Sequence, residues 1–396
     1  MEESKQKEHN HLCSPTGAQA ADYIITGAGC AGLSLAMHMM RSGELSNKKI
    51  LIIDKETKEA NDRTWCFWEK DPGLFQPIVA KEWKQLQFHS TSVFKQLDIE
   101  PYTYKLIRGI DFYNYCRQEL SKYSNVQWLH QTVDKIENRD GKAIVFSNNT
   151  QYEAPFIFNS ILFQKPQLKQ NDYWLLQHFK GWYIKTEEKS FDKDAATLMD
   201  FRCNQQNGTT FFYVLPLSDK EALIEYTLFS KEVLAQELYD RALKDYILSQ
   251  LAITDYEVAE EEFGVIPMTN HFFSSFNGNI INIGTAGGQT KGSSGYTFRF
   301  IQKHSQELVR CLEESGKPFK FKKAAKRFRF YDSVLLNILH SDTLPGEVIF
   351  SQLFERNKAS SVFKFLDNET SLQEELKIIS SLPTLPFAKA AFNHLF

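Results

Sequence analysis

The fold is first indicated by the stretch Asp22-Tyr23-Ile24-Ile25-Thr26-Gly27-Ala28-Gly29-Cys30-Ala31-Gly32-Leu33. It predicts a short buried strand, a glycine turn and the start of a helix. Gly27 permits a tight turn, Gly29 lets the backbone approach a pyrophosphate, and Gly32 lets the helix pack against the strand. The N-terminus of the helix then directs free N–H groups and the positive end of its dipole towards the phosphates. The stretch therefore predicts a dinucleotide-binding turn.

A second apolar strand supports this interpretation. Lys49-Ile50-Leu51-Ile52-Ile53 ends in Asp54, about 20 residues after the last glycine. A carboxylate at that spacing is expected to hold a ribose hydroxyl. The alternative is a tight strand-to-helix turn with a capping aspartate, but strand, glycines, helix and acid occur together here. Residues 22–54 therefore predict a βαβ unit.

The composition is that of a globular protein with many aromatic side chains. The 396 residues are 42% hydrophobic and 24% charged, and they suffice for a large core. The net charge of −3 argues against a general nucleic-acid binder. The 32 Phe, 16 Tyr and 6 Trp residues indicate either an aromatic-rich core or a tunnel for a large apolar ligand.

Cysteine usage and hydropathy indicate the compartment. Six scattered cysteines, with no CxxC pair and no metal-ligand spacing, indicate reduced thiols in a cytoplasmic setting and no metal site. No apolar run approaches the roughly 18 residues of a membrane span. Residues 1–20 are polar and lack an apolar signal core, so we expect a disordered tail there.

Strand-like and helix-like runs suggest how the chain is divided. Four strand-like runs at 181–229 and a helix at 231–250 predict an antiparallel substrate domain. Basic and aromatic residues alternate at 319–330, which predicts either contact with an anionic membrane surface or a solvated helix with inward Phe residues. We expect a tail at 1–20, a dinucleotide-binding domain at 21–82, 109–165 and 269–315, substrate-domain strands at 83–108, an antiparallel substrate domain at 166–268, and a C-terminal helical region, a candidate for membrane contact, at 316–396.

Two further segments have unusual compositions. Residues 61–69 hold two tryptophans, an arginine and two acids. The apolar strand 279–283 runs into a second glycine-rich turn at 284–296, and a helix follows. Each segment has a surface loop as its alternative explanation. Two glycine turns that each join a strand to a helix indicate one long cofactor held at both ends.

These segments resemble the lycopene cyclases, in particular the bacterial β-cyclase type. The resemblance rests on Arg63-Thr64-Trp65-Cys66-Phe67, on the turn at 284–296, and on Leu223-Ile224-Glu225-Tyr226-Thr227, in which Tyr replaces a second acid. It extends over roughly residues 22–340. The family implies an α/β fold like that of flavin-dependent aromatic hydroxylases, with a doubly wound, Rossmann-like FAD-binding domain and a mostly antiparallel substrate domain.

The resemblance also implies the cofactor. It is FAD in the reduced form, with NAD(P)H as a transient reductant. The sequence holds one dinucleotide fingerprint, so we expect no second Rossmann site for NAD(P)H. Flavoproteins of this fold often place Asp in the late turn, whereas Gly284-Thr285-Ala286 stands here, so backbone amides would make the flavin contacts. The expected FAD-binding residues are Gly27, Gly29, Gly32, Asp54, Arg63, Gly284, Ala286, Gly287 and Gly288.

The implied reaction is cyclisation of the acyclic ends of lycopene to β-ionone rings, giving γ-carotene and β-carotene. It is an isomerisation without net redox change. An alkene is a very weak base, so the enzyme needs a positioned acid that is still protonated at neutral pH. A buried carboxylic acid with a raised pKa can supply the proton, and aromatic faces can stabilise the cation. The candidate acids are Glu225, within an apolar strand, and then Glu69 and Asp62. The candidate cavity-wall residues are Trp65, Phe67, Trp68, Tyr226 and Tyr296.

Alternatives stay open at this level. The reduced flavin, rather than Glu225, could deliver the proton. The protein could be a redox flavoenzyme of the same fold, a prenyl-chain reductase or monooxygenase, or a non-catalytic carotenoid-binding flavoprotein. The expected partners are a lipophilic carotenoid, a membrane surface and other enzymes of the carotenoid pathway, and nucleic acid is not expected. The expected location is the cytoplasm, at the inner face of the cell membrane.

Overall fold

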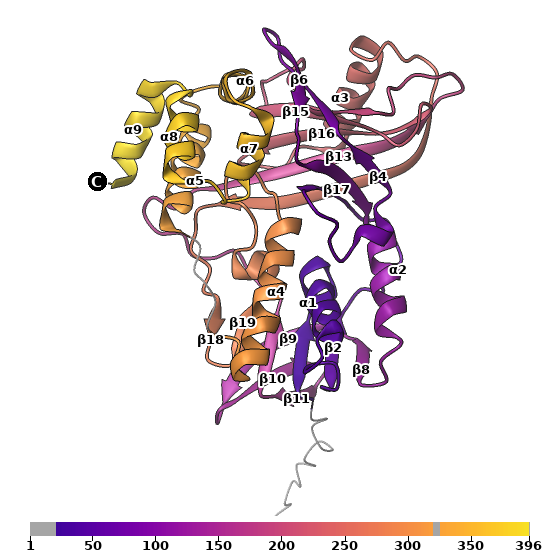
Figure 1. Cartoon of the computed structure of the whole chain (residues 1–396), viewed down its shortest axis with the longest axis vertical. Coiled ribbons are helices and arrows are strands. Elements are labelled where there is room, and N and C mark those ends of the chain that lie inside the picture. Colours follow the sequence, from indigo (N-terminus) through magenta and orange to yellow (C-terminus); the bar gives the residue numbers. More distant parts are fainter. Residues whose placement is uncertain (1–20, 320–324, 396) are drawn as a thin grey trace, which may run out of the picture.

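The computed structural model describes residues 21–319 and 325–395 (Figure 1). The tail expected at 1–20 lies outside the described residues, as does part of the basic and aromatic run at 319–330. The predicted βαβ unit is confirmed. β1 (Tyr23–Thr26) leads through the glycine turn into α1 (Cys30–Arg41), and β2 (Ile50–Asp54) pairs parallel to β1.

The nucleotide-binding sheet has six strands in the order β18-β19-β12-β1-β2-β8. Pairing is parallel except between the first two strands. The strands not yet introduced are β8 (Val126–His130), β12 (Phe156–Asn159), β18 (Phe276–Asn277) and β19 (Ile280–Asn282). Strands buried on both faces are continuously apolar. Ile25 and Ile52 accordingly pack towards α1, whereas Ile24 and Ile53 pack towards a three-stranded sheet.

Two small sheets flank the nucleotide-binding domain. The sheet that covers Ile24 and Ile53 consists of β9 (Val133–Arg139), β10 (Lys142–Ser147) and β11 (Thr150–Ala154). The other consists of β3 (Thr64–Glu69), β7 (Thr103–Arg108) and β4 (Lys81–Trp83), with η1 (Gln76–Ile78) before β4 and α2 (Gly109–Leu120) after β7. Strand β3 thus carries the tryptophan segment to the region between the two large sheets.

The second large sheet lies across the top of Figure 1 and has seven strands in the order β17-β13-β16-β15-β14-β5-β6. Its strands are β5 (Gln85–His89), β6 (Phe94–Asp98), β13 (Trp174–Lys185), β14 (Ala195–Asp200), β15 (Thr209–Pro216), β16 (Glu221–Ser230) and β17 (Glu257–Thr269). The predicted antiparallel pairing holds except between β14 and β5, which are parallel. The outer face packs on α3 (Gln236–Ser249). This helix starts at Gln236 rather than at the predicted residue 231. The Leu234 N–H group donates a hydrogen bond to the Tyr239 hydroxyl instead of joining the helix.

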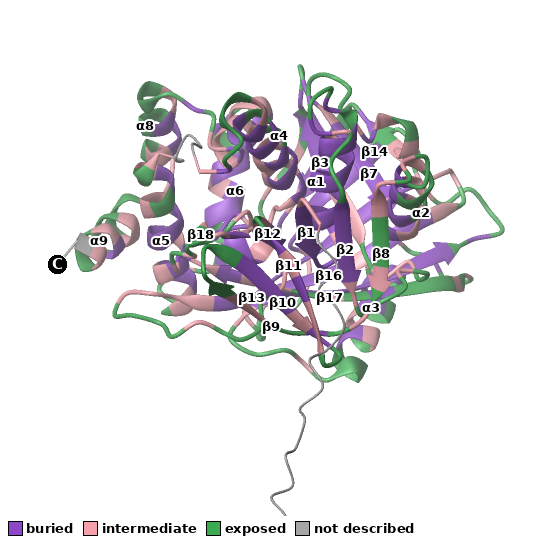
Figure 2. Ribbon diagram, turned by 90° about the horizontal axis from the view of Figure 1, so that it is seen from below, coloured by how far each residue is buried: buried purple, intermediate pink, exposed green. Residues whose placement is uncertain are grey.

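Helices at the C-terminal end cover part of the inner face of the seven-stranded sheet (Figure 1). They are α5 (Lys326–His340), α6 (Gly346–Arg356), α7 (Ala359–Leu366), α8 (Leu372–Ser380) and α9 (Thr384–Leu395), and they follow the long helix α4 (Phe298–Ser315) and η2 (Gly284–Gly287). Phe328 in α5 is buried, as the inward-packing alternative predicts. Figure 2 shows the buried residues running through both large sheets. In the parts of the chain that the structure describes, no helix is both long enough and apolar enough to cross a membrane.

Candidate active site

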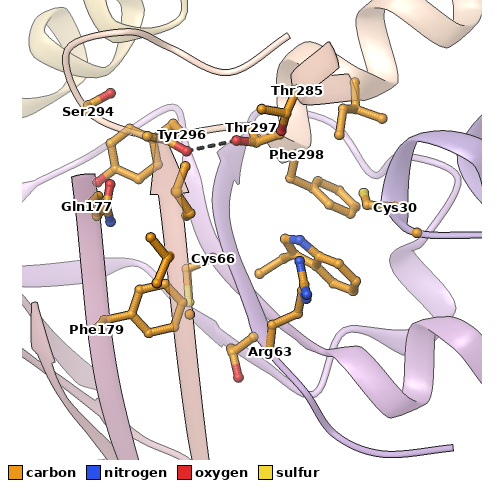
Figure 3. Close-up of a pocket in the computed structure, with 18 of the residues that line it drawn as sticks. Cys30, Arg63, Cys66, Gln177, Phe179, Thr285, Ser294, Tyr296, Thr297 and Phe298 are labelled. Carbon is orange, nitrogen blue, oxygen red and sulfur yellow. Dashed lines mark hydrogen bonds between the residues drawn. The ribbon is translucent and has the colours of Figure 1, made fainter. Parts of the chain in front are cut away.

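A cavity of about 310 Å³ lies between the nucleotide-binding domain and the inner face of the seven-stranded sheet. Figure 3 shows Gln177 and Phe179 on one side of it, and Cys30 and Phe298 on the other. Both glycine turns, β3 and four strands of the sheet contribute to its lining. The lining residues include 29–31, 63–66, Tyr104, Ser160, Gln177, Phe179, Tyr213, Leu215, Leu223, Glu225, 264–267, Gly284, Thr285, 294–298 and Ile301.

The three glycines of the first turn have different surroundings. A Cβ atom on Gly27, whose φ is +91°, would lie 2.2 Å from Ser160 Oγ, and one on Gly32 would lie 2.0 Å from the Gly27 carbonyl oxygen. A Cβ atom on Gly29 would meet no atom of the described structure within 4 Å. Gly29 is also the N-cap of α1, and no side chain caps the helix there. The free N–H groups of this N-terminus therefore face open space that suits a phosphate.

Asp54 occupies the place predicted for a ribose-binding acid. Its carboxylate accepts hydrogen bonds from the N–H groups of Ala28 and Glu56. A second cavity, of about 180 Å³, adjoins it at the carboxyl ends of β2 and β8 and includes Tyr113 and Trp128 in its lining. Both cavities border the first turn of α1. The two spaces and the turn between them fit an extended dinucleotide such as FAD.

The second glycine turn lies directly against the first. A Cβ atom on Gly284, whose φ is +61°, would lie 2.8 Å from Ala31 Cβ. Gly284 lines the main cavity, Ala286 is buried, and Gly288 adopts a left-handed conformation at the end of η2. A Cβ atom on Gly287 would lie 2.2 Å from the Asn282 carbonyl oxygen. The two turns, far apart in sequence, are thus positioned at one site.

Of the three predicted acids, Glu225 is the one that lines the cavity. Its carboxylate accepts a hydrogen bond of 2.6 Å from Thr227 Oγ1. Burial raises the pKa of Glu225 from an ordinary value of 4.5 to about 7. A carboxyl group in this environment is substantially protonated at neutral pH and can act as an acid.

A second acid that the sequence interpretation missed lies beside Glu225. Gly181 on β13 pairs with Glu225 on β16 and with Glu262 on β17, so all three residues face the same side. A Cβ atom on Gly181 would lie 3.0 Å from Glu262 Cγ. The absence of a side chain there lets the two carboxyl groups come within hydrogen-bonding reach. The alternation Glu262, Gly264, Ile266 in the sequence was a usable signal for this face.

Hydrogen bonds hold Glu262 in place. Thr64 Oγ1 donates to Glu262 Oε2 at 2.6 Å, and the Tyr183 hydroxyl lies 2.6 Å from Thr64 Oγ1. Since the single proton of Thr64 goes to Glu262, Tyr183 donates to Thr64. Burial, and secondarily the nearby Glu225, raises the pKa of Glu262 well above its ordinary range. This raised pKa favours the protonated, neutral form of Glu262.

Glu69 and Asp62 are not part of the cavity lining, and both have polar partners. Glu69 is buried and forms an ion pair of 2.8 Å with Lys105 and one of 3.5 Å with Arg299. Asp62 pairs with Arg63 at 3.1 Å and accepts a hydrogen bond of 2.9 Å from the Tyr113 hydroxyl. These contacts favour a structural role for both acids.

The predicted aromatic residues divide between the cavity and the core. Trp65 and Tyr296 line the cavity, as does Arg63. Phe67 stacks on Phe298 at 4.3 Å between ring centroids, and Trp68 stacks on Phe363 at 4.4 Å. Tyr226 faces the opposite side of the sheet, because it is adjacent to Glu225 in the strand and side chains alternate. Aromatic lining residues that the sequence interpretation did not single out are Tyr104, Phe179, Tyr213 and Phe298.

Comparison with known families identifies the chain. The family model described as lycopene cyclase protein matches residues 22–392. The chain belongs to the lycopene cyclase family. This lycopene cyclase family member is 24% identical over 270 residues to lycopene beta-cyclase of Pantoea ananas, which covers 63% of this chain and 62% of that protein. It is 26% identical over 308 residues to the chloroplastic neoxanthin synthase of Solanum tuberosum, with 72% and 59% covered. The matches thus span less than two thirds of either relative.

Solved structures show the same fold in this lycopene cyclase family member. A geranylgeranyl bacteriochlorophyll reductase-like protein from Thermoplasma acidophilum has a TM-score of 0.65 at 13% identity, covering 94% of this chain and 99% of that one. A flavoprotein/dehydrogenase from Cytophaga hutchinsonii has a TM-score of 0.63 at 12% identity, with 95% and 99% covered. A flavin-dependent brominase has a TM-score of 0.59 at 11% identity, with 88% and 94% covered. The predicted fold class is confirmed.

Proposed function

We propose that this protein is a lycopene β-cyclase, an isomerase that converts the acyclic ends of lycopene to β-ionone rings without net redox change. The observation that carries the proposal is Glu225. It places a carboxyl group whose pKa of about 7 leaves a large protonated fraction at neutral pH in a cavity with aromatic walls, in a chain of the lycopene cyclase family. Protonation of an alkene requires such an acid.

The cofactor we propose is reduced FAD, with NAD(P)H as its transient reductant. Gly29 and the N-terminus of α1 would hold the pyrophosphate, Asp54 the ribose, and Gly284 and Thr285 the flavin end. When bound, the reduced flavin supplies electron density beside a developing positive charge. Support comes from the open space over Gly29 and from the flavoprotein and the flavin-dependent brominase that share the fold.

In the proposed mechanism Glu225 transfers its proton to the terminal double bond of one end of lycopene. The tertiary cation is attacked by the neighbouring double bond, and a ring closes. Loss of one ring proton then restores neutrality, and the Glu225 carboxylate left by the first step is a base within the same cavity. One proton enters and one leaves, so the product is an isomer of the substrate.

The aromatic walls have a second role in this mechanism. Phe179, Trp65 and Phe298 line the cavity and can present ring faces to the cation. Each such contact contributes about 1–2 kcal/mol when water is excluded. Exclusion of water also prevents the cation from being hydrated to an alcohol. The apolar lining residues Leu215, Leu223 and Ile301 serve that purpose.

We also propose that the protein works at a membrane surface, because a carotenoid substrate partitions into lipid. Exposed apolar side chains on the C-terminal helices support this proposal. Leu376 on α8 is 65% exposed, and Leu385 and Phe392 on α9 are 84% and 61% exposed. Side chains of this kind bind lipid interfaces.

The proposed function is tested by expressing the full chain in cells that accumulate lycopene and separating the pigments by chromatography. The expected result is loss of lycopene and the appearance of ringed products of unchanged mass. A product heavier by two hydrogens would indicate a reductase, and one heavier by an oxygen a monooxygenase. Unaltered lycopene beside folded, flavin-loaded protein would contradict catalysis and favour a carotenoid carrier.

A further inference from the structure

Glu262 carries a carboxyl group that the proposed mechanism has not used. The residue is 3% exposed. Its Oε2 atom accepts the Thr64 hydroxyl, whereas no donor among the described residues reaches Oε1, which is also buried. An ionised carboxylate oxygen without a donor is costly in such a place. A proton on Oε1 removes this cost and turns the atom into a donor.

Glu225 is the neighbouring group that can accept that proton. Because the intervening residue on β13 is Gly181, the Glu262 side chain passes over the middle strand, with Oε1 3.3 Å from the position of a Gly181 Cβ atom. The Glu225 and Glu262 carboxyl groups lie within hydrogen-bonding reach. Since Thr227 donates to Glu225 Oε1, the Glu225 carboxylate can be held by two donors at once.

Arg63 is the cation that faces the pair in the part of the chain that the structure describes. The titratable and charged groups that face the two acids are Arg63 directly before β3, Cys66 on β3, Tyr183 from β13, Tyr213 from β15 and Tyr296 from the second glycine turn, and Tyr104 from β7 lies beside Cys66. Burial raises the pKa of each of these thiol and phenol groups, so all of them are neutral at physiological pH. Arg63 does not outweigh burial at Glu262, whose pKa remains raised.

We propose that Glu262 is a positioning residue that stays protonated and donates a hydrogen bond to Glu225 throughout the reaction. The proposal rests on the proposed function and adds a residue to it. A hydrogen bond to an ionised acceptor is roughly twice as strong as one between neutral groups. The bond therefore strengthens as Glu225 gives up its proton, which lowers the barrier more than it stabilises the resting state.

The proton balance follows from these roles. The proton that forms the new C–H bond comes from Glu225, and Glu262 keeps its own. Thr64 and Tyr183 fix the orientation of Glu262, because the Thr64 hydroxyl marks Oε2 as the accepting atom and leaves Oε1 to carry the proton. This arrangement also predicts how an amide would sit, with its oxygen at Thr64 and its NH2 group at Glu225.

The test compares Glu262→Gln with Glu262→Leu in the flavin-loaded full chain acting on lycopene. The amide keeps a neutral donor, so Glu262→Gln should retain kcat within about 10-fold. The pH above which kcat falls, the high-pH limb of the pH–rate profile, should be unchanged. Glu262→Leu removes the donor, so kcat should fall about 10- to 100-fold with KM little changed. Its high-pH limb should also move upward, because the Glu225 carboxylate has lost a stabilising bond.

Glu261→Gln is the matched control, since Glu261 is the neighbouring residue on β17, is 54% exposed in its side chain and pairs with Lys180. It should behave as the wild type. A Glu262→Gln variant that is folded but inactive would make Glu262 itself a proton donor and overturn the proposal. A Glu262→Leu variant with wild-type kcat and an unmoved limb would also overturn it.

A measurement without lycopene separates this inference from the proposed function. Infrared difference spectra of the flavin-loaded protein follow the carboxyl groups as pH is raised through the pKa of about 7 for Glu225. The carboxyl signal that disappears in Glu225→Gln should titrate at higher pH in Glu262→Leu than in the wild type. Equal titration in both proteins would contradict the pairing. The result holds whether or not the wild type cyclises lycopene.

Discussion

Glu225 on β16 and Glu262 on β17 face each other across Gly181 of the intervening strand β13. Two neighbouring acids in a buried environment cannot both ionise without a large free-energy cost, so the pair keeps at least one proton at neutral pH. Thr64 holds Glu262, and Glu225 opens onto the cavity. This difference in surroundings separates the roles of two residues with the same side chain.

Glu225→Gln should abolish cyclisation while leaving flavin binding intact. The amide cannot protonate an alkene, and loss of a general acid typically costs 10²- to 10⁴-fold. Pigment chromatography measures the first property, and the flavin absorbance of the purified protein measures the second. Glu221→Gln on the same strand is a matched control, because Glu221 pairs with Lys185 at the surface. A Glu225→Gln protein that produces rings at a near-normal rate would remove Glu225 from the mechanism and favour the flavin as proton source.

The rate of cyclisation should fall as pH rises through about 7. In the proposed mechanism Glu225 acts in its protonated form, and burial raises its pKa to about 7. The active form is therefore complete well below that pH and declines tenfold for each pH unit well above it. Initial rates over a pH series with fixed, reduced flavin measure this limb. A flat profile through this range would mean that another group supplies the proton.

The buried acid should cost stability in the same pH range. The pKa of Glu225 is about 7 in the folded protein and has an ordinary value of 4.5. The folded state thus binds more protons between these values, and its stability falls as pH rises from 4.5 through 7. Glu225→Gln should raise the free energy of unfolding above pH 7 by about 3 kcal/mol. Denaturant unfolding above pH 8 and near pH 4 checks the sign, since the gain should vanish at the lower pH.

The fold was predictable because its signals are local. The glycines at 27–32 and the acid at 54 have a spacing that one backbone geometry explains, and the strand runs alternate regularly. Glu225 was accessible for the same reason, as a charged residue within an apolar strand. Contacts between distant segments were not accessible in this way. That Trp68 stacks on Phe363 depends on how helices near the C-terminus dock on the sheet.

Glu262 shows why part of the site was missed. It stands in the run Glu260-Glu261-Glu262, which in sequence resembles a solvated edge. In the strand Glu261 is exposed and Glu262 is buried. Alternation alone does not say which of the two faces inward, and it is the pairing of Glu262 with Gly181 that brings Glu262 to Glu225. Register depends on pairing with two other strands, and a single strand does not contain that information. Tyr226 illustrates the reverse case, because its place next to Glu225 assigns it to the other face.

Gly29→Ala should weaken flavin binding more than it weakens the fold. A Cβ atom at Gly29 would meet no described protein atom within 4 Å, so the chain can accept it, but it would enter the space assigned to the pyrophosphate. The flavin content of purified protein should fall at least about 10-fold, with little change in the melting temperature of flavin-free protein. Gly43→Ala is the control, because its Cβ atom is equally unobstructed and lies beyond the end of α1. Equal flavin content in both variants would place the cofactor elsewhere.

Gly181→Ala should disturb the acid pair specifically. The new Cβ atom would lie 2.8 Å from Leu223 Cδ1 and 3.0 Å from Glu262 Cγ, so Glu262 must move away from Glu225. We expect a loss of about 1–3 kcal/mol of stability, a lower rate and a high-pH limb shifted upward. Gly264→Ala on β17 is the matched control, because its Cβ atom would meet the Phe179 ring instead. Gly264→Ala should lower the rate without shifting the high-pH limb of the pH–rate profile. If this limb lies at the same pH in both variants, Gly181 does not set the pairing of the two acids.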